Sequence, residues 1–249
     1  MHNTHNSFMT QDQSIQSLDR GLAIMRYIAA KGSVTASEVA IAIGVHQSSA
    51  SRLLSSLLKA GFVKKPTFHS FSLDYGSLEF AGLSLNSLPA VQSSYKLCNA
   101  ITNQTGLNVA VGMLRNNKVL YLTQNDIEMG HGLRFLSSTD IPLHRSSLGG
   151  VMSWALGKRS GLALLKKSYA DCSEQDGSKA LYQSIQESMD RSDLFWFTEQ
   201  EGVKFNASIP LKLDGELAAV AVYSRTKDVS IVKVQKILHE CRDILLSEQ

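Results

Sequence analysis

The sequence predicts an α+β protein with a helical N-terminal third, followed by a larger body built around an antiparallel sheet. Apolar residues recur every three or four positions up to about residue 60, as in amphipathic helices. In several segments after residue 106 they alternate instead, as in half-buried strands. The 249 residues are 43% hydrophobic, which is enough for one large or two ordinary domains and excludes a disordered chain.

The cysteines and the chain's start predict a cytoplasmic protein without a membrane segment. Cys98, Cys172 and Cys241 lie far apart and form no C-x-x-C pair, so we expect free thiols, buried or half-buried. Residues 1–16 form a polar tail without the features of a signal peptide. The longest charge-free stretch of interest, residues 80–95, is too short and too polar to span a bilayer.

The excess positive charge lies entirely in the N-terminal third. Residues 1–75 contain seven basic and four acidic side chains, whereas residues 76–249 contain 18 of each. A basic N-terminal part on a neutral body favours an anionic partner for that part.

Three helices are predicted within residues 17–60. Ser17 is placed to cap the first, and Thr35 with Glu38 forms a capping box at the start of the second. Gly44 ends the second helix, and the third runs from about Gln47 to Ala60. Two short helices across a glycine-containing turn are typical of a helix-turn-helix.

The outer face of the third helix is small, polar and basic. Ser48, Ser51, Arg52, Ser55 and Lys59 share this face, which carries two cations and no carboxylate. Such a face does not repel phosphate and allows close approach to a duplex. The alternative is a three-helix module that binds another protein, but the outer face is not apolar.

A β-hairpin follows the third helix. Residues 62–65 and 70–73 are predicted strands joined by a turn at 66–69, which makes residues 17–74 a winged helix-turn-helix domain. The residues expected to contact double-stranded DNA lie on the third helix and the wing: Gln47, Ser48, Ser49, Ser51, Arg52, Ser55, Lys64 and Lys65.

This segment resembles the N-terminal domain of IclR-type bacterial transcriptional regulators. The matching residues are Ser17, Arg20, Leu22, Glu38, Ala40, Arg52, Leu53, Leu54, Leu57, Gly61 and Val63. Ser49 stands where the family usually has threonine, which keeps the hydroxyl. The resemblance extends over about residues 17–247. It implies an operator-binding homodimer or dimer of dimers, a linker and dimerisation helix at 75–88, and an effector-binding domain of GAF-like fold at 89–249.

The remaining predicted elements fit such a domain. Helices are expected at 90–105, 148–156, 161–169, 178–189 and 229–246, and strands at 107–114, 119–123, 132–136, 205–211 and 217–223.

Two motifs in this part also resemble the family's. Residues 141–149 resemble P-L-H-x-[ST]-x-x-G, and residues 202–210 resemble G-V-x-x-x-A-x-P. The resemblance implies an effector pocket between them, with two serines at a helix N-terminus as its polar end. The expected lining is Ser146, Ser147, Leu148, Gly149, Phe205, Ala221 and Tyr223.

Several positions depart from the family towards apolar side chains. Gly150 replaces a common lysine, and Phe205, Ala221 and Tyr223 stand where relatives have small or polar residues. Residues 195–197, Phe-Trp-Phe, are also more apolar. We therefore expect an organic effector acid, with an aromatic one favoured over a small polar one. The alternative is a body used only for oligomerisation, without an effector.

Other functions have weaker support. Asp140, His144 and Ser147 combine the residue types of a catalytic triad, but the serine lacks a G-x-S-x-G elbow, and His144 is expected to bond backbone in its loop. No nucleotide-binding or HExxH motif is present. We expect no catalytic residue, cofactor or metal site. The sequence therefore predicts a DNA-binding regulator, with repression of a catabolic operon as the family's commoner mode.

Overall fold

The computed structural model describes residues 14–135, 141–200, 202–227 and 229–247. The chain divides into two compact units, residues 1–85 and residues 86–249, which we call the N-terminal and C-terminal units. Of the described helices, none has the length and apolar character that crossing a bilayer requires.

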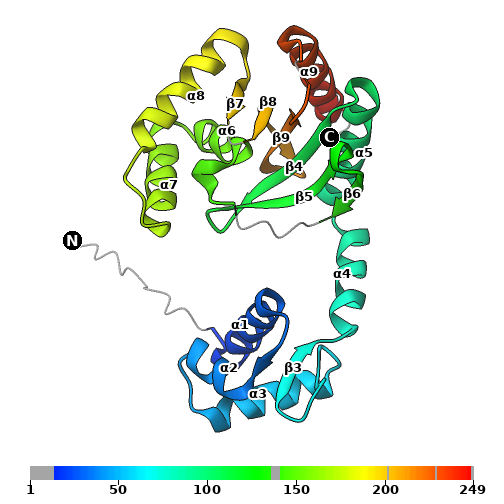
Figure 1. The fold of residues 1–249 in the computed structure, drawn as a ribbon, viewed down its shortest axis with the longest axis vertical. Helices are drawn as coiled ribbons and strands as arrows, with labels where there is room; N and C mark the ends of the chain where they lie inside the picture. The colour runs from blue at the N-terminus through cyan, green and yellow to red at the C-terminus, as the bar shows by residue number, and fades with distance from the viewer. Residues whose placement is uncertain (1–13, 136–140, 201, 228, 248–249) are drawn as a thin grey trace, which may run out of the picture. The chain divides into compact units, whose positions relative to one another are not determined.

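The N-terminal unit contains three helices, a three-stranded sheet and most of a fourth helix (Figure 1). The elements are α1 (Gln16–Lys31), β1 (Val34–Thr35), α2 (Ala36–Ala42), α3 (Gln47–Lys59), β2 (Val63–Lys64), β3 (Ser70–Leu73) and α4 (Gly76–Ser87). The strands are antiparallel in the order β1-β3-β2. The predicted helix-helix-helix-hairpin order is confirmed.

Capping determines where α2 starts. Thr35 Oγ1 accepts a hydrogen bond from the Glu38 backbone N–H, and Glu38 accepts one from the Thr35 N–H, so the predicted capping box is present. The prediction for α1 was wrong: Ile15 is the N-cap, without a side-chain hydrogen bond in the described chain, and Ser17 lies inside the helix.

One apolar core holds the N-terminal unit together. It comprises Ile24, Ile28, Val34, Val39, Ala40, Ala50, Leu54, Val63 and Phe71. Strand β1 places Val34 opposite Phe71 on β3, and it was not predicted because it has only two residues. Leu58, expected to face inward, is 39% exposed because it lies in the last turn of α3, beyond this core.

The C-terminal unit is a six-stranded antiparallel sheet with helices on both faces (Figure 1). Its strands are β4 (Asn108–Arg115), β5 (Lys118–Asp126), β6 (His131–Phe135), β7 (Phe195–Gln200), β8 (Val203–Leu213) and β9 (Glu216–Ser224). Its helices are α5 (Pro89–Thr105), α6 (Ser147–Ala155), α7 (Lys158–Asp171), α8 (Ser178–Ser192) and α9 (Ile231–Ser247), with short 3-10 turns η1 (Ile127–Met129) and η2 (Leu143–Arg145). The strand order is β6-β5-β4-β9-β8-β7.

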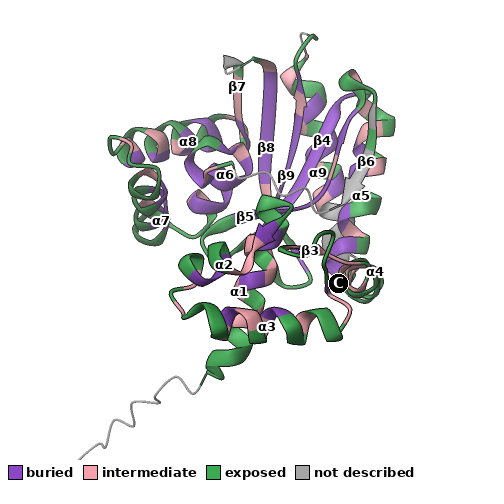
Figure 2. Ribbon diagram, turned by 60° about the horizontal axis from the view of Figure 1, so that its bottom comes forward, coloured by how far each residue is buried: buried purple, intermediate pink, exposed green. Residues whose placement is uncertain are grey.

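The sheet is the buried centre of this unit, between α6–α8 and the pair α5 and α9 (Figure 2). The face towards α6–α8 is occupied by one cluster, whose buried members include Ala110, Tyr121, Leu148, Val151, Met152, Leu165, Ile185, Phe195, Ala219 and Ala221. The predicted α+β class is confirmed. Strand β7 was not predicted, because its Phe-Trp-Phe segment lacks an alternating pattern.

The capping box yields the first prediction. Replacing Thr35 by alanine removes the acceptor for the Glu38 N–H and should lower the unfolding free energy of the N-terminal unit by about 1 kcal/mol. Both tryptophans, Trp154 and Trp196, belong to the C-terminal unit, so a urea transition seen by far-UV circular dichroism but not by tryptophan fluorescence reports the N-terminal unit.

Ser37→Ala is the matched control, because this exposed side chain lies in the same first turn and is not part of the capping box. An equal loss of stability in both variants would show that the capping box contributes nothing.

Candidate nucleic-acid interface and ligand site

Helix α3 has a buried apolar side and an outward side that carries polar residues. Ala50 and Leu54 are fully buried on the inner side. Of the predicted contact residues, Gln47, Ser48, Arg52 and Ser55 are exposed, whereas Ser49 and Ser51 are half-buried. The exposed four are therefore the better placed to reach base edges and phosphates.

The start of α3 favours an anion. His46 is its N-cap, no side chain among the described residues caps it, and its first turn contains no acidic residue. The first N–H groups of a helix lack partners within the helix and carry the positive end of its dipole. A DNA phosphate can accept hydrogen bonds from them.

The wing supplies two ordered cations. The Lys64 ammonium lies 5.2 Å from the centre of the Tyr75 ring, and the Lys65 ammonium lies 5.3 Å and 5.1 Å from the rings of Phe68 and Phe71. Both lysines are exposed. Contact between ammonium groups and aromatic rings restricts these side chains while their charges stay in solvent.

Phe68 was not singled out from the sequence. Its side chain is 81% exposed between the two strands of the wing, and its ring meets the ring of His69 edge-on. An aromatic residue inside a predicted polar turn was the signal that could have identified it.

In the C-terminal unit, the residues predicted to form the polar end of the effector pocket lie at the start of α6. Ser146 is the N-cap, its Oγ accepts a hydrogen bond from the Gly149 N–H, and the same oxygen lies 3.0 Å from the Tyr121 hydroxyl. Burial raises the pKa of Tyr121, and the hydrogen bond with Ser146 opposes this rise. Tyr121 is therefore a neutral hydroxyl at physiological pH.

The structure brings six of the seven predicted lining residues to one side of the sheet. Ser146, Ser147, Leu148 and Gly149 lie at the start of α6. Ser208 pairs with Ala221, and its hydroxyl lies 3.4 Å from the Ser147 carbonyl, so Ala221 faces α6. Tyr223, two residues further along β9, shares that face.

Phe205 is the exception, and its placement in the pocket was wrong. It pairs with Ser224 on β9, whereas its neighbour Asn206 pairs with Tyr223. Because successive side chains of a strand point to opposite faces, Phe205 lies on the face covered by α5 and α9.

The expected apolar walls are filled by the protein itself. Leu148 is 1% exposed and Ala221 2%, and both belong to the cluster between the sheet and α6–α8. Neither contributes a free wall for a ligand in this structure.

Unsatisfied polar atoms lie near Tyr223 instead. The side-chain oxygen of Asn206 is buried without a hydrogen-bond partner among the described residues, and so is Asp126 Oδ1. Asp126 Oδ2 accepts a 2.6 Å hydrogen bond from Arg225, whose guanidinium lies over the Tyr223 ring. Buried polar groups are normally paired, so these two oxygens indicate a place for a donor. No sequence pattern indicates them, since their burial depends on the pairing of distant strands.

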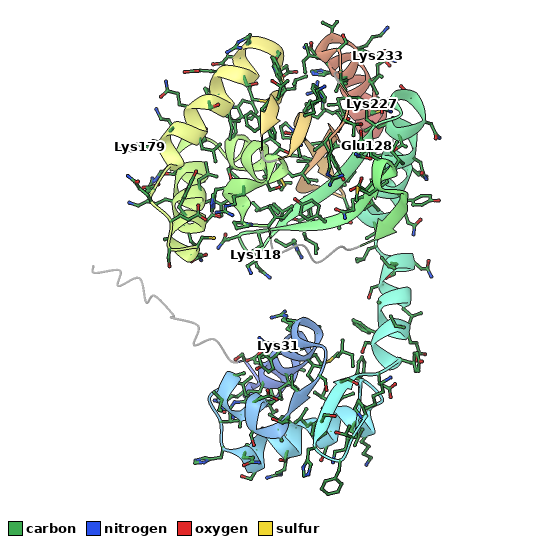
Figure 3. All side chains as sticks on the ribbon, in the orientation of Figure 1. Lys31, Lys118, Glu128, Lys179, Lys227 and Lys233 are labelled. Carbon is green, nitrogen blue, oxygen red and sulfur yellow. The ribbon has the colours of Figure 1, made fainter. Side chains whose placement is uncertain are left out.

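Glu128 lies at the end of the sheet where β4 begins and β9 ends, and it connects the two (Figure 3). Its carboxylate accepts hydrogen bonds from Asn108 Nδ2, Ser224 Oγ, Thr226 Oγ1 and the Arg225 backbone N–H, at 2.6–2.9 Å. Loss of hydration raises its pKa, but the four donors outweigh this and lower the pKa to about 2. The network joins η1 to the end of β9.

The hypothetical triad is not assembled by the described residues. The His144 ring bonds the side chains of Ser168 and Glu174, rather than backbone as expected, because η2 packs against the end of α7. Ser147 is not among its partners, and Asp140 lies outside the described residues. Cys98 and Cys241 are buried free thiols, whereas Cys172 is exposed, contrary to expectation, because it ends α7 at the surface.

The three helices and the hairpin define a winged helix-turn-helix protein. Residues 17–66 match the family model of the IclR helix-turn-helix domain. The chain therefore carries an IclR-type helix-turn-helix domain, and the resemblance found in the sequence is confirmed.

A comparison over a longer stretch also finds a helix-turn-helix regulator. The uncharacterized HTH-type transcriptional regulator RhmR of Escherichia coli (strain K12) is 22% identical over 147 residues, which is 59% of this chain and 56% of RhmR. The match thus spans little more than half the length of that relative.

Solved structures show the same fold along nearly the whole chain. An IclR family transcriptional regulator from Brucella abortus has a TM-score of 0.78 at 17% identity, covering 99% of this chain and 97% of its own. An IclR homologue from Microbacterium hydrocarbonoxydans, solved in complex with 4-hydroxybenzoate, has a TM-score of 0.69 at 14% identity, covering 93% of this chain and 98% of its own.

The second prediction concerns Glu128. Its lowered pKa stabilises the folded state fully above the unfolded pKa of about 4.3, and this contribution disappears as the pH falls towards 2. Glu128→Gln should therefore lower the unfolding free energy at pH 7 by roughly 1–2 kcal/mol, a value reduced for solvent screening. The difference from wild type should shrink between pH 4.5 and 2.

Urea unfolding followed by tryptophan fluorescence measures this difference at each pH. Glu216→Gln is the control, because Glu216 forms a 3.6 Å ion pair with Arg115 in which both side chains are more than half exposed. A Glu128→Gln deficit that is constant with pH would contradict the assignment.

Proposed function

We propose that the protein is a DNA-binding transcriptional regulator, a repressor of a catabolic operon, whose operator affinity changes when an organic acid binds the C-terminal unit. The exposed face of α3 carries this proposal. It combines Gln47, Ser48, Arg52 and Ser55 with a helix start that favours anions, beside the two wing lysines. Side chains on α3 would read base edges in the major groove, and the wing cations would bind phosphates.

Dimerisation through α4 is part of the proposal. Leu78, Phe80 and Leu83 on this helix are 67%, 64% and 66% exposed, which is costly for three large apolar side chains. Pairing this helix with that of a second copy would bury them and place two winged helices on one duplex. A dimer of dimers would need a further contact, because two paired α4 helices occupy this one.

The DNA proposal predicts a change in salt dependence. Each phosphate that a cation neutralises contributes about −0.9 to the slope of log K against log salt concentration. The double variant Lys64→Ala/Lys65→Ala should therefore have a slope less negative by about 2 than wild type. Fluorescence anisotropy of a fluorescein-labelled duplex of arbitrary sequence measures it.

Lys118→Ala/Lys179→Ala is the control with equal loss of charge, since both lysines are exposed on the C-terminal unit (Figure 3). Equal slopes for the wing variant and wild type would contradict a role for the wing in DNA binding.

An effector that is both carboxylated and hydroxylated fits the C-terminal unit best. Its carboxylate would accept hydrogen bonds from backbone N–H groups at the start of α6. Its hydroxyl would donate to the unpaired oxygen of Asn206, which lies two residues along β8 from Ser208 and about 7 Å from it. An aromatic ring between the carboxylate and the hydroxyl would lie beside Tyr223. The 4-hydroxybenzoate complex of the Microbacterium homologue supports the same class of ligand.

This proposal predicts that wild type binds 4-hydroxybenzoate about 2–10-fold more tightly than benzoate, the value of one net hydrogen bond. Asn206→Leu should abolish this ratio. Phe205→Leu, on the opposite face of the sheet, should lower stability but leave the ratio of the two affinities unchanged. Isothermal titration calorimetry gives both affinities.

Equal binding of the two acids by wild type, or tight binding of pyruvate with no aromatic acid detected, would contradict the proposed ligand class.

One observation favours a second candidate, a regulator without an effector. Leu148 and Ala221 belong to the packed core and leave no wall for a ligand. The C-terminal unit would then serve only oligomerisation. Failure of every organic acid to bind, together with unchanged DNA binding, would favour it.

A further inference from the structure

We propose that His144, Cys172 and Glu174 form a binding site for one transition-metal ion, with Zn²⁺ as the preferred ion. The site belongs to the C-terminal unit and is separate from the Asn206 ligand site. One ligand atom from each residue, an imidazole nitrogen, the thiol sulfur and a carboxylate oxygen, lies within 4.8 Å of the other two.

The end of α7 brings two of the ligands together. The backbone N–H groups of Cys172 and Glu174 both donate to the Tyr169 carbonyl, at 3.2 Å and 3.0 Å. Ser173 between them has φ 57°, in the left-handed region, which turns the chain back on itself. This turn directs both side chains towards η2.

His144 is held in place from three sides. Its ring stacks on that of Tyr169 with centres 4.0 Å apart. Nδ1 lies 2.8 Å from Ser168 Oγ, and Nε2 lies 3.2 Å from Glu174 Oε2. A ring proton on Nδ1, donated to Ser168, leaves the Nε2 lone pair facing the carboxylate and the thiol. A hydrogen bond of this kind on the second ring nitrogen is typical of metal-binding histidines.

Glu174 is also oriented for a ligand. Arg145 donates to Glu174 Oε1 at 2.8 Å, which leaves Oε2 directed at His144. When an ion binds, bonds form from the metal to Nε2, Sγ and Oε2, and the thiol proton passes to water. The cation takes the place of any proton between Nε2 and Oε2.

The donor set determines the metal. Nitrogen, sulfur and oxygen donors together suit Zn²⁺, which takes four ligands in a tetrahedron with bonds of about 2.0–2.3 Å. In such a tetrahedron the ligand atoms lie about 3.3–3.6 Å apart. Cys172 is exposed, so its side chain can rotate to shorten the longer separations. Water would occupy the fourth position.

The site would connect two segments that lie far apart in the sequence, η2 and the end of α7. An ion on these residues would join η2 to the end of α7, and η2 leads directly into Ser146, the N-cap of α6. The ion would thus stabilise the backbone that presents the start of α6. The competing interpretation is that His144, Glu174 and Arg145 form a hydrogen-bonded network with no metal.

Co²⁺ titration of the full chain distinguishes the two, because Co²⁺ substitutes for Zn²⁺ and its thiolate complexes absorb in the near ultraviolet and visible. We expect one equivalent to give a thiolate-to-cobalt band together with the visible bands of tetrahedral Co²⁺, and Zn²⁺ to displace both. Cys172→Ser should lose the thiolate band, and Glu174→Gln should weaken Co²⁺ binding at least 10-fold.

Three controls keep the result specific. Cys241→Ser removes a buried thiol outside the cluster, and Glu187→Gln removes an exposed carboxylate, so both should bind as wild type does. His2→Ala/His5→Ala tests the two histidines of the N-terminal tail. Absence of the thiolate band in wild type, or its survival in Cys172→Ser, would overturn the proposal. Thermal unfolding of each variant without metal verifies that it folds.

Discussion

The burial of Ala50 and Leu54 on one side of α3 determines what the N-terminal unit can do. Both side chains are fully buried beneath α1, α2 and the wing, so the helix cannot rotate without exposing them. Their burial directs Arg52 and Ser55 outward. The small polar residues on that face leave room for a duplex, and the wing lysines extend the positive surface. The face that we propose for DNA recognition therefore follows from how the core packs.

In the C-terminal unit, strand register determines which side chains face α6. Asn206 and Tyr223 face α6 because β8 and β9 pair directly across from each other. A shift of β8 by one residue would put Phe205 opposite Tyr223 in place of Asn206, and an apolar side chain would replace a polar one on that face. The four hydrogen bonds to Glu128 fasten η1 to the end of β9 and so stabilise this arrangement. The ligand chemistry that we propose for the unit thus depends on residues outside the proposed ligand site.

The elements with strong local signals were predictable. Helices α3 and α5 and the capping box at Thr35 depend on neighbours within a turn or two, and the structure has them where expected, although Leu58 at the end of α3 is exposed. Non-local features were not predictable. The face of Phe205, the unpaired oxygens of Asn206 and Asp126, and the approach of Cys172 to His144 all require the pairing of distant segments.

The most direct test of the account is selection of duplexes from a randomised pool by the full-length protein. Two winged helices paired through α4 should enrich a pseudo-palindrome whose half-sites lie about 34 Å, or a multiple of that, apart. Gln47→Ala, which removes an exposed residue at the start of α3, should lose preference at one base pair of each half-site. No enriched sequence, or one identical for wild type and Gln47→Ala, would contradict the assignment of α3 as the recognition helix.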